Sequence, residues 1–279
     1  MNYYSDLAAE NRELYPKKNE IPEEIIDLSG FRVGRIKIES DREAKKINRP
    51  IGNYITVEAP MGFLSCDSEA LARLLIGEIK NIIKKPPETV LFAGLGNRAI
   101  TPDALGPKTA EKVIATRHIS PSFAEKIGLE GLKTVAAISP GVLGQTGIET
   151  QETVKSAAEI VCPDLVVTVD ALTARSAYRL GNTIQITDSG ISPGSGVGNK
   201  RAEISEKTLS VPVISIGVPT VVNARGLVEE LGLKTDFPDM IVTPKDIDSI
   251  IDSASRILAL ALNLFFQPHL DIDIIKNCM

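Results

Sequence analysis

The chain of 279 residues has no tryptophan, two histidines and three cysteines. Cys66, Cys162 and Cys278 lie far apart, which excludes a CxxC redox pair and a zinc knuckle. We expect reduced thiols, two of them in the core. His118 and His269 do not share a strand-end loop with a Ser or Cys. The sequence therefore offers no nucleophile and base pair for Ser-His or Cys-His catalysis. A histidine metal site is disfavoured too, whereas a site of mixed carboxylates remains open.

Positive charge is also in short supply. The 31 Lys and Arg against 36 Asp and Glu leave a net charge of −5, whereas nucleic acids and membrane surfaces are bound by clustered Lys and Arg. The N-terminus is polar and lacks the apolar stretch of a signal peptide. The longest apolar run, at 257–266, is shorter than the roughly 20 residues that a bilayer requires. We therefore expect a cytoplasmic protein with no nucleic-acid or membrane partner.

A hydrophobic content of 43 % is enough for one large α/β domain. Residues 31–40 and 53–59 alternate apolar and polar side chains, as strands do, and 67–85 have helical spacing. Further on, segments apolar on both faces alternate with helical ones. The expected strands are 89–96, 133–139, 164–172, 182–188 and 211–219, and the expected helices are 107–118, 150–162 and 244–266. This order predicts a three-layer domain, a mostly parallel central sheet covered by helices, with a small N-terminal β extension.

Ligands of such sheets bind where the strands end, and polar, glycine-rich loops follow these strands. Gly94, Gly96 and Ala99 match a loose dinucleotide pattern, but Pro102 and Pro107 interrupt the helix that should follow. The next strand also ends without an acidic residue to bind a ribose. We therefore expect no nucleotide and no other cofactor.

The loop PGSGVGNKR lacks the GK[ST] ending of a phosphate loop. Its glycines leave backbone amides open to a ligand, so a substrate-binding loop and a plain flexible turn are both possible. The substrate-binding candidates are Gly94, Gly96, Asn97, Gly194, Gly196, Gly198, Asn199, Lys200 and Arg201.

Two carboxylates remain, Asp103 in the first loop and Asp170 at the end of DLVVTVD. An aspartate that closes an apolar strand is costly to bury without a partner, so it is either bonded structurally or held there for chemistry. Two carboxylates that face one cleft can share a proton and divide the acid and base roles.

The ordered motifs GLGN, TPDALGP, TRH, SPGVLGQTGIET, VDAL, DSGISPGSGVGNKR, PVISIGVPTVV and VTPKDID resemble the germination protease family of endospore-forming bacteria. The resemblance runs from about Val90 to the C-terminal helix and rests on long, rare motifs. It implies an endopeptidase that cleaves small acid-soluble spore proteins at germination, in the forespore and spore core. It also implies a homo-oligomer, a tetramer.

In that family the aspartates of TPDALGP and VDAL are regarded as the catalytic pair, and they fall on Asp103 and Asp170. The family fold resembles that of hydrogenase maturation endopeptidases, whose GxGN loop and DA strand end carry metal ligands. Germination proteases are not known to depend on a metal, so the resemblance implies none here.

Residues 5–10, SDLAAE, resemble the family's processing and substrate site, Thr-Glu-Phe-Ala-Ser-Glu, which is cut after the acidic residue. This implies a zymogen that cuts itself between Asp6 and Leu7, with 1–6 as propeptide and 7–279 as a single peptidase domain. A chance match in a polar terminus is the alternative. The sequence departs from the family in two places. Only four residues precede SDLAAE, which puts the control of the zymogen in question. The segment after Ala224 is short, which puts in question any lid or oligomer contact that it supplies in the family.

For the mechanism we expect Asp103 or Asp170 to activate water while the other protonates the leaving amine. Amides around 94–97 or 194–198 are candidates for oxyanion stabilisation. Lys200, Arg201 and Arg175 are candidates for the cationic subsite that reads the acidic residue. The alternatives are an inactive peptide-binding sporulation protein and a metal-dependent maturation-type peptidase.

Overall fold

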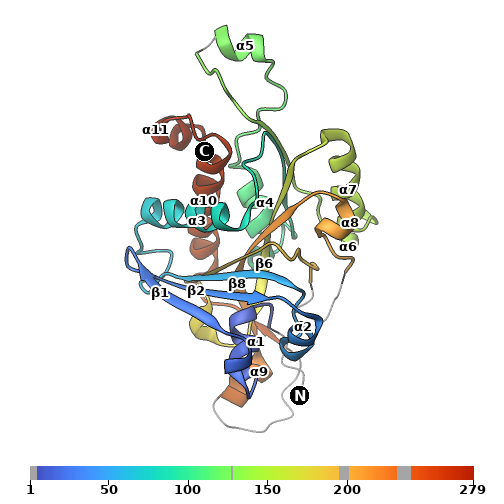
Figure 1. Cartoon of the computed structure of the whole chain (residues 1–279). Coiled ribbons are helices and arrows are strands. Elements are labelled where there is room, and N and C mark those ends of the chain that lie inside the picture. Colours follow the sequence, from blue (N-terminus) through green and yellow to red (C-terminus); the bar gives the residue numbers. More distant parts are fainter. Residues whose placement is uncertain (1–4, 127, 195–200, 231–239) are drawn as a thin grey trace.

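The computed structural model of the chain describes residues 5–126, 128–194, 201–230 and 240–279. Its middle layer is a nine-stranded sheet with the order β1-β2-β3-β7-β8-β6-β4-β5, and β9 pairs with β8. Helices cover both faces of this sheet (Figure 1). The predicted three-layer α/β class is confirmed.

The sheet is mixed rather than mostly parallel. Its parallel part is β8-β6-β4-β5, and the remaining pairings are antiparallel. The connection from β6 to β7 is too short for a parallel crossover, so β7 runs back and accepts β3 at its other edge. The predicted N-terminal β extension is therefore one edge of the central sheet. The strands are β1 Glu23–Leu28, β2 Phe31–Ile38, β3 Gly52–Glu58, β4 Thr89–Gly94, β5 Thr134–Ile138, β6 Leu165–Ala174, β7 Thr183–Thr187, β8 Val213–Asn223 and β9 Ile241–Val242.

Two apolar clusters lie on opposite faces of the sheet. On one face the strands pack against α3, α4 and α10, and on the other face against α7 and α8 (Figure 1). Helix α10 is long and apolar enough to cross a membrane, yet 72 % of its apolar stretch is buried inside the protein, as in a core helix. The helices are α1 Ala8–Leu14, α2 Asp41–Ile47, α3 Ser68–Ile82, α4 Leu105–Ala110, α5 Pro121–Lys126, α6 Leu143–Thr146, α7 Thr150–Val161, α8 Glu206–Leu209, α9 Ala224–Glu230, α10 Ile247–Phe266 and α11 Ile272–Cys278.

The helix expected over 107–118 ends at Ala110. The amides beyond it have partners elsewhere in the fold: the Ile114 N–H donates to Asn263 Oδ1 at 2.9 Å, and the Thr116 N–H donates to the Val135 carbonyl at 2.9 Å. Tertiary hydrogen bonds therefore override the local helical pattern.

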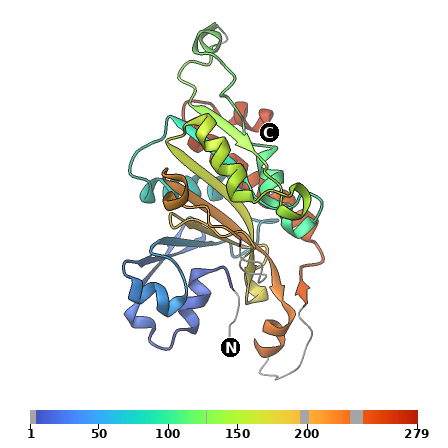
Figure 2. The ribbon, with the colours of Figure 1, turned by 90° about the vertical axis from the view of Figure 1, so that its right-hand side faces the viewer.

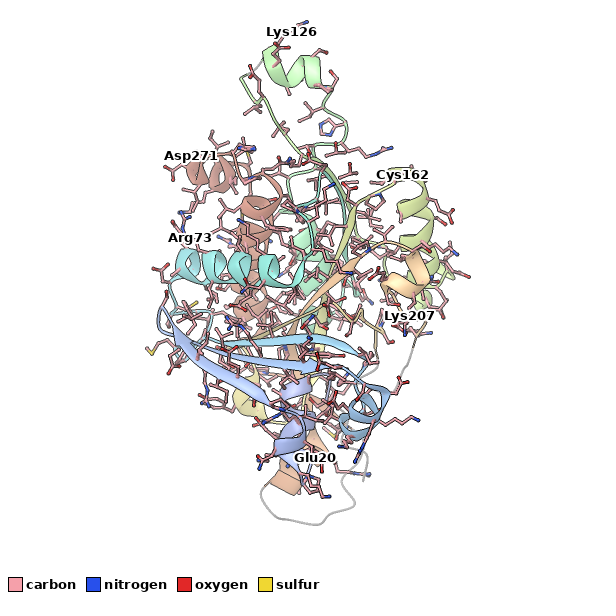
Figure 3. All side chains as sticks on the ribbon, viewed as in Figure 1. Glu20, Arg73, Lys126, Cys162, Lys207 and Asp271 are labelled. Atoms are coloured by element: carbon pink, nitrogen blue, oxygen red, sulfur yellow. The ribbon has the colours of Figure 1, made fainter. Side chains whose placement is uncertain are left out.

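Our expectation of two core cysteines is wrong. Cys66 is half-buried, and Cys162 and Cys278 are exposed. Cys162 follows the end of α7 (Figure 3), where it adopts a left-handed conformation outside the packed face of the helix. All three are free thiols.

The first residues fold against the N-terminal strands. Helices α1 and α2 lie side by side at one end of the molecule (Figure 2). Ala8 and Ala9 pack there with Ile36 and Tyr54 of the sheet. An ion pair of 2.7 Å between Arg12 and Glu23 ties α1 to β1. Ser5 and Asp6, the described part of the predicted propeptide, thus continue directly into a docked helix.

Candidate active site

Glycine packing brings the loop after β4 back against the sheet. A Cβ on Gly94 would lie 2.1 Å from the Gly106 carbonyl oxygen. Gly96, with φ of +111°, leaves no room either, because its Cβ would lie 2.2 Å from the Asp103 carbonyl oxygen. These glycines therefore hold Asp103 close to the ends of β4 and β6.

Asp103 is half-buried, and the Asn97 N–H donates to its Oδ2 at 2.7 Å. Burial raises the pKa of Asp103, and the hydrogen bond from Asn97 opposes this shift. The Asn97 side chain is engaged too, since its Oδ1 accepts from Gln145 Nε2 at 2.7 Å. Asn97 thereby links the first strand-end loop to the second.

Asp170 lies in β6 and is 5 % exposed. Burial raises its pKa well above the ordinary aspartate value, and the nearby carboxylates of Asp103 and Asp6 raise it further. A hydrogen bond of 2.9 Å from the Ala171 N–H opposes them. The structure therefore brings Asp103 and Asp170 together, in an environment that favours one shared proton over two charges.

Asp6, which carries the third carboxylate, is bound to Thr173 of β6 through its backbone and its side chain. The backbone N–H of Asp6 donates to the Thr173 carbonyl at 2.8 Å, and the Thr173 N–H donates to Asp6 Oδ2 at 2.9 Å. Arg49 Nη2 lies 3.9 Å from Asp6 Oδ1 and also donates to the Ser5 carbonyl. The acidic side chain before the predicted cut thus faces a backbone donor and a guanidinium.

The side chain of Gln185 binds the backbone on the two sides of Leu7. Gln185 Nε2 donates to the Asp6 carbonyl at 3.0 Å, and the Ala8 N–H donates to Gln185 Oε1 at 2.7 Å. Leu7 is fully buried in an apolar pocket; the pocket is formed by Leu172, Ala174 and Val222 with Leu180, Ile191 and Leu227.

A second acidic side chain of the same segment is also bound. Glu10 is 2 % exposed, and its carboxylate accepts from the N–H groups of Arg175 at 2.7 Å and Ser176 at 2.9 Å. Arg179 Nε lies 3.6 Å from it. SDLAAE is therefore docked at both of its acidic positions.

A cavity of about 1050 Å³ adjoins this segment. Asp6, Arg49 and Gln185 contribute to its wall, together with Gly217 of β8. The loop after β7 contributes Gly190–Ser192, and Arg201 reaches the same cavity. Of the predicted substrate-binding residues that the structure describes, Arg201 therefore lines this cavity, whereas Asp103 and Asp170 are not among its lining residues.

The other predicted site residues fall in two groups. Gly194 lies in a turn with φ of +71°, and Arg201 Nη1 lies 3.7 Å from Glu149. Gly196, Gly198, Asn199 and Lys200 lie outside the described residues. Within the described ranges, no three His, Cys, Asp or Glu side chains are grouped to hold a metal ion.

Arg49 and Gln185 were not predicted from the sequence. Arg49 follows α2 in a segment with no glycine motif, and Gln185 is one polar residue in the strand pattern TIQIT. The only signal was the alternation of NTIQITD itself, since a polar side chain inside a buried strand needs a partner.

Comparison with known proteins identifies the family. A family model described as germination protease matches residues 6–237. This chain belongs to the germination protease family. A germination protease of Clostridium tetani is 38 % identical over 324 residues, covering 99 % of both chains. One of Caldanaerobacter subterraneus is 41 % identical over 309 residues, covering 95 % of this chain and 94 % of its own.

The germination proteases are thus similar to this chain over nearly its whole length, and the family supports a protease function in spores. The alignment of 324 positions exceeds the 279 residues here, so the Clostridium protein has segments that this family member lacks. Among solved structures, a [NiFe] hydrogenase maturation protease of Thermococcus kodakarensis aligns with a TM-score of 0.41 and 18 % identity, covering 68 % of this chain and 98 % of its own.

Proposed function

We propose that this germination protease is an endopeptidase that degrades small acid-soluble spore proteins when germination starts, cuts after an acidic residue, and acts in the forespore and spore core. One observation carries the proposal. The Asp6–Leu7 peptide, in a sequence resembling the family's substrate site, is bound by Gln185, and the Asp6 carboxylate lies near enough to Asp170 to raise the pKa of that aspartate.

The chemistry that we propose uses these two carboxylates and water. Ionised Asp103 takes a proton from a water molecule, whose oxygen attacks the carbonyl carbon of the acidic residue. Asp170, whose raised pKa favours its protonated form, gives its proton to the leaving nitrogen as the C–N bond breaks. The proton on Asp103 then returns to Asp170, which restores the pair.

Docking of the acidic residues suggests how a substrate is read. In our proposal, the side chain before the cut binds the Thr173 N–H and Arg49, as Asp6 does. The second acid of Thr-Glu-Phe-Ala-Ser-Glu binds the Arg175 and Ser176 amides, as Glu10 does. Arg49 thereby replaces Lys200, Arg201 and Arg175 as our candidate for the cationic subsite before the cut.

We further propose that the same site processes the chain itself. Cleavage between Asp6 and Leu7 releases residues 1–6, and residues 7–279 form the peptidase. The contacts of Asp6, Leu7 and Glu10 support a bound substrate segment rather than a chance match, because each of these side chains is buried against the body. We also propose a homo-oligomer, by resemblance a tetramer. Light scattering on the purified protein measures its mass and tests this assembly.

The test combines the chain's own processing with a peptide. The parent, Asp103→Asn and Asp170→Asn are purified and incubated with a peptide that contains Thr-Glu-Phe-Ala-Ser-Glu, and all products are identified by mass spectrometry. We expect the parent alone to lose residues 1–6 and to cut the peptide after its first Glu. Unchanged cleavage by either variant would refute the carboxylate pair.

Two other outcomes point to other functions. A folded parent that binds the peptide without cutting it is an inactive binding protein. A parent whose activity disappears with chelation, and returns when a divalent metal is restored, is a metal-dependent peptidase. Metal analysis of the purified protein accompanies both measurements.

A further inference from the structure

Gln185 and Asp170 stand on either side of one glycine in the sheet. In the strand register, Gln185 of β7 pairs with Gly217 of β8, and Gly217 pairs with Asp170 of β6. Directly paired residues project from the same face, and two strand spacings separate the outer ones by about 10 Å. Because Gly217 has no side chain, the side chain of Leu172 packs over it, so that a Cβ on Gly217 would lie 2.4 Å from Leu172 Cγ. Leu172 belongs to the apolar cluster that buries Leu7, so the docked segment rests on the face that carries Asp170 and Gln185.

The Gln185 side chain binds peptide backbone in the manner of a neighbouring strand. Its Nε2 donates to the Asp6 carbonyl at 3.0 Å and its Oε1 accepts from the Ala8 N–H at 2.7 Å. These are the carbonyl before and the N–H after Leu7, the two groups that one residue of a parallel strand would bond. The partners also fix the orientation of the amide, since its oxygen faces a donor and its nitrogen an acceptor.

This contact is made where charge would develop during cleavage. The Asp6 carbonyl belongs to the bond that we propose is cut, and Gln185 is 6 % exposed. A donor that meets a forming oxyanion in a buried site stabilises it more strongly than it stabilises the neutral carbonyl. Both contacts are to backbone atoms, so they are available to any bound sequence.

We propose that Gln185 is a catalytic residue, which aligns the peptide through the N–H of the second residue after the cut and stabilises the oxyanion on the carbonyl before the cut. The inference rests on the proposed function, because it takes Asp6–Leu7 as the bond that is cut. The oxyanion donor is then a side chain of β7, in place of the backbone amides around 94–97 or 194–198 that were candidates from the sequence.

The full chain carrying Gln185→Met or Gln185→Glu is compared with the parent on the Thr-Glu-Phe-Ala-Ser-Glu peptide. Methionine removes both hydrogen bonds at similar volume, and ionised glutamate keeps the acceptor while losing the donor. We expect kcat to fall by about 10²–10³-fold in both variants, with KM changed only a few-fold in Gln185→Glu. Lowering the pH should partly restore kcat in Gln185→Glu alone, as its carboxyl gains a proton to donate.

A matched control is available in the core. Gln267 is 2 % exposed and binds the backbone of Lys133 in the same two-sided way, accepting from its N–H and donating to its carbonyl at 2.9 Å each. Gln267→Met therefore removes an equivalent pair of hydrogen bonds far from the carboxylates. It should lower the melting temperature and leave kcat within about twofold.

A modified peptide isolates the second contact. Replacing the amide between Phe and Ala by an ester removes the N–H that Gln185 accepts. We expect this ester to raise KM for the parent and to have no further effect on Gln185→Met.

The outcomes separate this inference from the proposed function. A parent that does not cut the peptide refutes the proposed function and the inference with it. A parent that cuts, beside a folded Gln185→Met with kcat within threefold of it, refutes the inference alone. So does an ester that raises KM equally in both proteins.

Discussion

Gly94 and Gly106 pack backbone to backbone, so that a Cβ on Gly94 would lie 2.1 Å from the Gly106 carbonyl oxygen. The two nearest neighbours of that Cβ are main-chain atoms of Gly106, and the third is Ala110 Cβ at 3.0 Å, so a methyl group can be accepted only if the loop moves. Asp103 is on the same loop. The packing of two glycines therefore decides how far this carboxylate lies from Asp170.

Gly94→Ala should lower both stability and activity. We expect a loss of several kcal/mol in the free energy of unfolding or a shifted loop, as for overpacked backbone contacts, and at least a tenfold fall in kcat. Denaturant unfolding and peptide cleavage measure the two effects. Gly77→Ala is the control, because Gly77 lies in α3 with no atom within 4 Å of its Cβ position; it should gain about 0.5–1 kcal/mol. Equal behaviour of the two variants would contradict the packing role.

The second prediction concerns Asp170 and pH. Burial raises the pKa of Asp170, so the folded protein retains a proton that the unfolded chain loses above about pH 4. Stability from this group therefore falls as the pH rises above about 4, up to the raised pKa. Asp170→Asn removes the penalty and should unfold at a higher temperature than the parent near neutral pH. The difference should shrink as the pH falls toward 4.

Asp164→Asn is a control of opposite sign. The N–H groups of Thr89 and Glu88 lower the pKa of Asp164, each donating to its Oδ2 at 3.0 Å. The stability from Asp164 is therefore present above about pH 4 and is lost as the pH falls through its lowered pKa. Its variant should melt below the parent at neutral pH. Thermal melts that move in the same direction for both variants would contradict the assigned shifts.

The third prediction tests the acidic subsite. Arg49→Gln should reduce the preference for Glu over Gln before the cut by about tenfold, or ~1.4 kcal/mol, because a charge facing the acidic side chain is lost. Competition between the two peptides, followed by mass spectrometry, measures the ratio. Arg201→Gln is the comparison, since Arg201 pairs with Glu149. If Arg201→Gln removes the preference and Arg49→Gln does not, the subsite was assigned to the wrong arginine.

The fourth prediction concerns the docking of the first residues. Leu7 is fully buried, so Leu7→Ala should weaken docking by about 2–5 kcal/mol. Amide exchange of residues 5–14 should accelerate, and processing at Asp6 should slow. Leu14→Ala, at a position that is 38 % exposed, should change either rate little. Unaltered exchange in Leu7→Ala would mean that the apolar pocket does not hold the segment.

Many strands and helices could be predicted from the sequence because the patterns that indicate them lie within single segments. Segments apolar on both faces form β4, β6 and β8, and the helical spacing after Asp67 forms α3. Asp170 stood out as an unmatched charge inside such a segment. Asp103 could be selected because it follows the neighbouring strand, and the family resemblance added a role for both.

What the sequence did not reveal depends on register between distant segments. Arg49 and Gln185 reach the site only because β3 pairs with β7 and β7 with β8, and no local pattern encodes those pairings. The helix expected at 107–118 is shortened for the same kind of reason, since Asn263 binds the Ile114 amide from α10.

The anchoring of α1 gives the proposed cut an unusual outcome. Breaking Asp6–Leu7 leaves the new N-terminal ammonium of Leu7 on a stretch that Glu10 and Arg12 still bind to the body. A tethered stretch of this kind has an effective concentration on the order of millimolar. In the function that we propose, an incoming substrate therefore competes with an intramolecular product, and the rate at which α1 leaves its docked position limits turnover.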